Sequence, residues 1–217
     1  MSVLITGTSS GIGKATAELF TAHGYSVIGI DRNESEISQD DYYRHIVWDI
    51  NDYANTPEIE DEIEILVNNA GTQCENDLDT NLKSTIMLTE KFGVQPHIKS
   101  IVNVASTSAH NGSEFPEYAA SKGGLLAYSK NVAQRVAKFG ATCNSISPGG
   151  VITEINKHII ESDDLYDAVL DETLLHRWAT AEEIAEWIYF LAVVNKSMTA
   201  QDVIIDNGEI SKFNFIW

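Results

Sequence analysis

The chain has few cysteines and few cations. Its two cysteines among 217 residues, Cys74 and Cys143, lie far apart, which predicts two buried free thiols and no disulfide framework. Lysine and arginine number 14 against 32 aspartates and glutamates, a formal charge of -18. Surfaces that bind nucleic acid or anionic lipid need clustered lysine and arginine, so the composition argues against both partners.

Long apolar runs are also missing. The longest, such as residues 187–194, are far shorter than a membrane span. Strand-like residues begin almost at Met1, so we expect no leader peptide and a cytoplasmic location. The densest acidic run, residues 58–64, lacks the glycine and asparagine pattern of a calcium loop, so we expect a solvated face and no metal site.

Strands alternate with helices along the whole chain. We predict strands at residues 3–5, 25–30, 43–48, 65–67, 100–104, 141–146 and 203–205, with helices between most of them. This order predicts one domain, residues 1–217, with a Rossmann-type doubly wound α/β fold: a parallel sheet with helices on both faces. Ligands in such sheets bind at the carboxyl ends of the strands. The connections 49–65 and 71–81 are too short for a full crossover helix.

A glycine-rich turn, Thr6-Gly7-Thr8-Ser9-Ser10-Gly11-Ile12-Gly13, joins the first strand to the first helix. Backbone N–H groups at such a helix N-terminus bind a pyrophosphate. Asp31 ends the second strand, at about the spacing from which a carboxylate accepts hydrogen bonds from the adenosine ribose of NAD and repels the extra phosphate of NADP. An ordinary turn and a loop aspartate are the simpler alternatives.

The stretch Tyr118-Ala119-Ala120-Ser121-Lys122 opens a long predicted helix. Four-residue spacing puts Tyr118 and Lys122 on one face, one turn apart. A fixed positive charge near a phenol favours the phenolate, which makes Tyr118 a candidate general acid or base. The same spacing is typical of surface neighbours, but of the eight tyrosines only Tyr118 has lysine four residues on.

Together these motifs resemble the short-chain dehydrogenase/reductase family over nearly the whole chain. The glycine turn matches that family's cofactor turn, Asn68-Asn69-Ala70-Gly71 its motif after the fourth strand, and Asp206-Asn207-Gly208 is similar to its Asp-Gly-Gly ending. The family's four catalytic positions match Asn81, Ser106, Tyr118 and Lys122.

The resemblance implies a role for each of these four. Tyr118 would exchange a proton with the substrate oxygen, and Ser106 would hydrogen-bond that oxygen, with Ser108 as a competing candidate. Lys122 would hold the nicotinamide ribose and assist Tyr118, and Asn81 would support a water chain to Lys122. The implied cofactor contacts are Gly7, Ser9, Ser10, Gly11, Ile12, Gly13, Asp31, Asp49, Ile50, Asn69, Ala70, Gly71, Tyr118, Lys122, Pro148, Gly149, Val151 and Thr153.

The implied function is hydride transfer between NAD(H) and a secondary alcohol or its ketone. The resemblance also implies a homodimer or homotetramer joined through the helices of Asn81 and Tyr118. One alternative is an NAD(H)-binding sensor or scaffold without turnover. Another is a ketoacyl thioester reductase, which Asp31 disfavours because such family members mostly use NADPH.

Three further segments carry expectations. Residues 153–178, polar and helical in pieces, predict a lid over the substrate, with a peripheral helix as the alternative. His110 lies in a predicted loop and is expected to face solvent, with a place in the substrate pocket as the alternative. The apolar tail, residues 213–217, predicts burial in a subunit interface.

Overall fold

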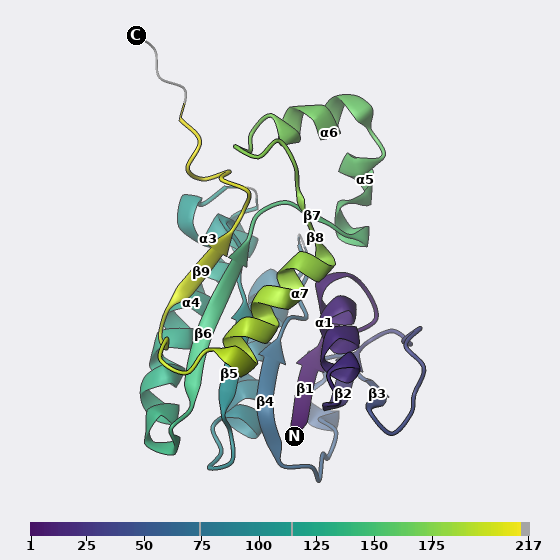
Figure 1. Ribbon diagram of the computed structural model, residues 1–217, viewed down its shortest axis with the longest axis vertical. Helices are drawn as coiled ribbons and strands as arrows, with labels where there is room; N and C mark the ends of the chain where they lie inside the picture. Colours follow the sequence, from purple (N-terminus) through teal and green to yellow (C-terminus); the bar gives the residue numbers. More distant parts are fainter. Residues whose placement is uncertain (74, 114, 214–217) are drawn as a thin grey trace.

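The computed structural model describes residues 1–73, 75–113 and 115–213. Within them, seven parallel strands form one sheet in the order β3-β2-β1-β4-β5-β6-β9 (Figure 1). The strands are β1 (Ser2–Thr6), β2 (Ser26–Asp31), β3 (Tyr43–Val47), β4 (Ile63–Asn68), β5 (Ser100–Val104), β6 (Thr142–Pro148) and β9 (Asp202–Ile205). The predicted doubly wound α/β fold is confirmed.

Side chains on the central strands alternate between the two faces of the sheet, as a pleated strand requires. Val3 and Ile5 on β1 belong to a buried cluster with side chains of α1 (Gly11–Ala22) and α7 (Ala181–Tyr189). Leu4 belongs to a second cluster that includes residues of α4 (Pro116–Val136). Figure 1 shows α1 and α7 in front of the sheet and α4 behind it. Two cores, one on each face, therefore hold the sheet.

The helix predicted over residues 79–92 is a continuous run with a mixed hydrogen-bond pattern. It consists of α2 (Ser84–Leu88) between two π-helical turns, η2 (Leu78–Lys83) and η3 (Thr89–Gly93). This run packs on the same side of the sheet as α4, because Leu88 and Phe92 join the second cluster. Its first turn, η2, carries Asn81.

Local signals set the ends of the other long helices. Proline at the first position starts α4, because its missing N–H would have no partner there, and the helix continues through η4 (Ala137–Phe139) to Gly140 in the left-handed conformation. Thr180 and Glu183 form a capping box at the start of α7: Thr180 N donates to Glu183 Oε2 at 2.9 Å and Glu183 N to Thr180 Oγ1 at 3.3 Å. From α7 the chain continues as η6 (Phe190–Val194).

Two crossovers lack a full helix. Residues 32–42 join β2 to β3 without one, and between β3 and β4 the chain makes only the single turn η1 (Tyr53–Asn55). Trp48 and Ile50, both buried, fill the space beside Ile30 that a crossover helix would cover. The predicted short connection at residues 49–65 is confirmed, although β3 ends at Val47, one residue earlier than predicted.

A separate excursion leaves the main sheet after β6. Its two ends pair as a small parallel sheet of β7 (Val151–Ile152) and β8 (Ala179–Thr180). Between them lie η5 (Glu154–Asn156), α5 (Lys157–Ile160) and α6 (Asp163–Leu170). Figure 1 shows α5 and α6 beyond the carboxyl ends of the main strands. The helical pieces follow the sequence pattern, whereas two-residue strands are too short to show a period.

His110 is exposed, as expected, but the predicted loop around it is a short helix. Residues Ser108–Asn111 form a short helix, α3, and His110 Nε2 lies 2.8 Å from Asp202 Oδ2 on β9. This contact ties α3 to the edge strand and leaves 29% of the His110 side chain exposed.

The two cysteines and the tail have different outcomes. Cys143 is a buried free thiol, as expected, and burial raises its pKa to about 12. Cys74 and residues 214–217 lie outside the described residues, while Phe213 is 72% exposed. Among the helices of the described chain, none is long and apolar enough to cross a membrane.

Candidate active site

A cavity of about 330 Å³ opens at the carboxyl ends of the central strands. Its walls come from residues at or just after the ends of the first six strands, from α4 and from the start of the excursion after β6. The order of strands reverses between β1 and β4, and a doubly wound sheet leaves its binding crevice at such a point.

The glycine turn shapes one wall of this cavity. Gly7 and Gly11 have φ of +79° and +52°, which side chains disfavour, and a Cβ on Gly13 would lie 2.0 Å from the Gly7 carbonyl oxygen. Ser10, Gly11 and Ile12 line the cavity where α1 begins, and Ser10 makes no side-chain cap hydrogen bond there. The first N–H groups of α1 are thus placed for an anionic ligand.

Asp31 lies at one end of the cavity. Its Oδ2 accepts a hydrogen bond from Ser9 N at 3.1 Å and its Oδ1 one from Asn33 N at 2.9 Å. These two donors fix the carboxylate, and its other lone pairs can accept from a ribose diol. Arg32, which directly follows, also lines the cavity.

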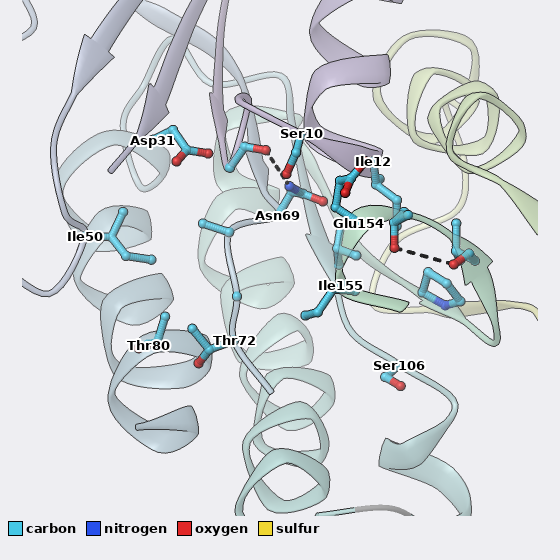
Figure 2. Close-up of a pocket in the computed structure, with 18 of the residues that line it drawn as sticks. Ser10, Ile12, Asp31, Ile50, Asn69, Thr72, Thr80, Ser106, Glu154 and Ile155 are labelled. Atoms are coloured by element: carbon cyan, nitrogen blue, oxygen red, sulfur yellow. Dashed lines mark hydrogen bonds between the residues drawn. The ribbon is translucent and has the colours of Figure 1, made fainter. Parts of the chain in front are cut away.

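The end of β4 is clamped to the glycine turn. Thr6 Oγ1 accepts hydrogen bonds from Asn69 N and Ala70 N, both at 3.0 Å. The Asn69 amide in turn donates to the carbonyl oxygens of Thr6, at 3.0 Å, and Gly7, at 3.3 Å; Figure 2 draws one of these two bonds as a dashed line. The asparagine therefore serves to hold two walls of the cavity together.

Tyr118 and Lys122 both reach the cavity from α4. Lys122 Nζ lies 5.6 Å from the centre of the Tyr118 ring and donates to the Val104 carbonyl oxygen at 2.9 Å. Lys122 is 5% exposed, and this burial lowers its pKa to about 8, against the opposing influence of the Asp77 carboxylate. Its ammonium form therefore predominates at neutral pH.

Ser106 follows β5 and lines the cavity, whereas Ser108 does not. The Ser106 hydroxyl donates to Ser108 Oγ and accepts from Ser108 N, both at 3.2 Å. Ser108 is thus a support for Ser106, and Ser106 is the hydroxyl that a ligand in the cavity can reach.

Asn81 is buried behind the cavity wall. Its Oδ1 accepts from Thr72 N at 2.8 Å, and its Nδ2 donates to Thr72 O at 3.0 Å and to Ser121 Oγ at 3.1 Å. The amide is therefore occupied in holding the chain after β4 against α4.

The cavity gathers most of the residues that the sequence singled out. Those that line it are Gly7, Ser10, Gly11, Ile12, Asp31, Asp49, Ile50, Asn69, Ala70, Gly71, Ser106, Tyr118, Lys122, Pro148, Gly149, Val151 and Thr153. Ser9, Gly13 and Asn81 lie behind it, where each supports a residue that does line it.

Sequence reasoning missed several lining residues. They are Arg32, Asn33, Trp48, Asn51, Thr72, Thr80, Val104, Ala105, Glu154, Ile155 and Asn156. Most adjoin a residue that was predicted and could have been found by extending each strand end by two positions. Thr72 and Thr80 adjoin the predicted Gly71 and Asn81, but they lie too far from any strand end for this rule to find them.

The fold and the cavity define a Rossmann-type α/β protein with a crevice of the kind that binds dinucleotides. Residues 7–209 match the family described as Enoyl-(Acyl carrier protein) reductase. The chain is similar to the 3-oxoacyl-[acyl-carrier-protein] reductase FabG of Salmonella typhimurium, with 30% identity across 94% of this chain and 95% of that protein. It is also similar to the acetoacetyl-CoA reductase of Paracoccus denitrificans, with 31% identity across 87% and 89%.

Solved structures agree in fold. A short chain dehydrogenase family protein from Francisella tularensis superposes with a TM-score of 0.84 and 26% identity, covering 97% of this chain and 99% of that one. A 4-hydroxyisoleucine dehydrogenase complexed with NADH gives a TM-score of 0.89 at 24% identity, covering 98% and 99%. The chain belongs to the short-chain dehydrogenase/reductase family, a family of oxidoreductases.

Proposed function

We propose that this protein is an NAD(H)-dependent oxidoreductase that transfers hydride between a secondary alcohol and its ketone. One observation carries the proposal: Tyr118, Lys122 and Ser106 share a cavity with the anchored carboxylate of Asp31. Figure 2 has Ser106 and Asp31 on opposite sides of that cavity. An extended dinucleotide with a reactive group at one end fits such an arrangement.

The residues along the cavity fit the parts of such a cofactor. Asp31 would accept hydrogen bonds from the adenosine ribose, with Asp49 and Ile50 beside the adenine. The N–H groups at the start of α1 would bind the pyrophosphate. Val151 and Thr153 would hold the nicotinamide end, which supplies or accepts the hydride when bound.

The proton chemistry would come from the protein. Ser106 would donate a hydrogen bond to the substrate oxygen and so orient it. Tyr118 would give its proton to that oxygen during reduction and take it back during oxidation. Lys122, with a pKa of about 8, carries a positive charge at neutral pH that stabilises the phenolate.

Asp31 favours NAD over NADP. Two N–H donors hold its carboxylate at the ribose end, where it would repel a 2′-phosphate. The adjacent Arg32 would act in the opposite direction, because an arginine near this position can bind the 2′-phosphate of NADP. Arg32 is exposed, whereas Asp31 is only partly exposed and anchored, so we infer that the carboxylate dominates.

The substrate would be a small alcohol or carbonyl compound. Two similar proteins are named as thioester reductases, but a chain with a formal charge of -18 repels the anionic carriers of such substrates. Residues 153–178 would cover the substrate, because Glu154, Ile155 and Asn156 at their start line the same cavity.

We also infer a homodimer or homotetramer joined through the helices of Asn81 and Tyr118. Leu78 at the start of η2 and Phe115 just before α4 are exposed large apolar side chains, and η2 packs against α4. A second copy would cover both.

Thermal unfolding with NADH and, separately, with NADPH tests the cofactor. A ligand at a hundred times its dissociation constant stabilises by about 2.7 kcal/mol, and each kcal/mol raises the midpoint by about 2–4 °C for a chain of this size. We expect a shift with NADH alone. Asp31→Asn is the matched control and should weaken the response to NADH and permit one to NADPH. No shift with either cofactor would refute the proposal.

Tyr118→Phe separates an enzyme from a sensor. The variant lacks the transferable proton, so turnover of any alcohol or ketone should fall by at least about a hundredfold. The thermal shift with NADH should stay as in the wild type, because the ring remains. A wild-type protein that binds NADH yet oxidises no alcohol and reduces no ketone in a broad screen would favour the sensor.

A further inference from the structure

The chain between β4 and η2 is closed by a buried carboxylate. Asp77 is 1% exposed, and its Oδ1 accepts from Thr72 Oγ1 at 3.0 Å and from Glu75 N at 3.3 Å. Asn76 takes the left-handed conformation, with φ of +51°, to make this turn. A buried charge is costly unless something compensates it, so its place needs a reason.

Hydrogen bonds connect Asp77 to the helix that carries Tyr118. Thr72, whose hydroxyl binds Asp77, has its backbone N–H and C=O bound by the amide of Asn81. The same amide donates to Ser121 Oγ, and Ser121 Oγ donates to the Tyr118 carbonyl oxygen at 2.7 Å. Asp77 therefore lies at the far end of a buried chain of contacts that ends on the first turns of α4.

The same carboxylate acts on Lys122 through its charge. Among the described residues, Tyr118 on the same helix has its ring centre 5.6 Å from Lys122 Nζ, and the carboxylate of Asp77 acts on Lys122 through its charge. Gly71 lets the segment pass close to Lys122, because a Cβ at Gly71 would lie 2.9 Å from Asn81 Oδ1 and 3.5 Å from Lys122 Nζ. Burial disfavours the ammonium form of Lys122, and the negative charge of Asp77 opposes that effect.

We propose that Asp77 is a positioning residue of this active site, which holds Thr72, the partner of Asn81, in place and keeps a negative charge acting on Lys122. Its importance for turnover rests on the proposed function. Its effect on Lys122 does not, because both groups belong to the chain without any cofactor. Lys122 keeps its proton at neutral pH in part because Asp77 is there.

An NMR titration of the full chain without cofactor tests this directly. The ε-carbon signal of Lys122, assigned by its loss in Lys122→Arg, should titrate with a midpoint of about 8 in the wild type. In Asp77→Asn, which keeps the size of the side chain but removes its charge, the midpoint should move to lower pH. Asp79→Asn is the matched control: it removes a nearby carboxylate that is exposed and pairs with Lys83 at 3.1 Å, so the midpoint should stay at the wild-type value. An unchanged midpoint in Asp77→Asn would overturn the proposal.

A second measurement needs no substitution at Asp77. In the wild type, the carboxyl carbon of Asp77 should show a step at the Lys122 midpoint, because each group senses the charge of the other. A flat carboxyl signal between pH 7 and 9 would refute the coupling even if Asp77→Asn did not fold.

Turnover supplies the third readout and separates the two proposals. If the protein reduces ketones, the alkaline limb of its kcat/KM profile should move to lower pH in Asp77→Asn and stay in place in Asp79→Asn. A limb that did not move would contradict a role of Asp77 in the reaction. If no ketone is reduced by the wild type, the proposed function fails, while the titration still decides whether Asp77 holds the charge of Lys122.

Discussion

The glycine turn offers the sharpest test of the geometry, through Gly13→Ala. A Cβ at this position would lie 2.0 Å from the Gly7 carbonyl oxygen and 2.5 Å from Asn69 Nδ2. Ordinary contacts are longer than 3.4 Å, so the first turn of α1 or the Gly7 peptide has to move by more than an ångström. Backbone and a clamped amide surround the site, and neither can swing away as a flexible side chain would.

The expected cost follows from overpacking. Extra methyl groups in a close-packed site destabilise by about 1–3 kcal/mol, and Gly13→Ala belongs at the upper end because the obstacle is backbone. For 217 residues this lowers the unfolding midpoint by roughly 4–12 °C, at about 2–4 °C per kcal/mol. NADH should also lose its stabilising effect, because the displaced groups line the cavity on both sides of the turn.

The control is a glycine-to-alanine substitution at a helical position where the added Cβ meets no close neighbour. Gly123 lies in α4, and a Cβ there would have its nearest neighbour, Ala109 O, at 3.9 Å. Gly123→Ala should therefore stabilise the protein by about 0.5–1 kcal/mol through helix propensity. Differential scanning calorimetry, with and without NADH, measures both variants. A Gly13→Ala protein as stable as the wild type and with full NADH response would refute the geometry of the turn.

Two further predictions concern Lys122 and the assembly. The pKa of Lys122 is about 8 in the folded chain and 10.5 in the unfolded chain. Between these two values the unfolded chain binds more protons than the folded chain, so the free energy of unfolding rises with pH, by about 3 kcal/mol over the whole window. Lys122→Met should lack this rise in the free energy of unfolding. The difference between the two proteins cancels the opposite contribution of Cys143, which both contain. If the two curves of unfolding free energy against pH run parallel, the lowered pKa of Lys122 is disproved. Sedimentation velocity should find two or four copies of the chain in the wild type. The double variant Leu78→Glu, Phe115→Glu should shift the protein toward the monomer. An unchanged sedimentation coefficient in that variant would exclude this interface.

Much of the fold was readable from the sequence, because its signals are local. Most strands of the main sheet contain a short apolar run, and the long helices have local start signals, such as proline at the first position of α4 and the capping box of Thr180. The glycine turn and the pair Tyr118 and Lys122 are also local, since their spacing alone brings their groups together. The parallel sheet then follows from alternation, and the carboxyl ends of the strands collect at one edge.

The finer parts of the site depend on residues that are distant in sequence. Asn81 could be named as a catalytic position by resemblance, but its amide reaches Thr72 and Ser121 only because η2 and α4 pack side by side. His110 pairs with Asp202 across 92 positions, which no periodicity could indicate.

Asp77 could not be identified as a site residue from the sequence. In the sequence it is one acidic residue among 32, with nothing to separate it from a solvated neighbour such as Asp79. The sequence by itself determined the sheet, the glycine turn and the spacing of Tyr118 and Lys122, because these depend on contacts within a few residues. Only the tertiary structure decided that Asp77 is buried and that its charge acts on Lys122, because both depend on how a shortened connection packs against a helix more than forty positions away.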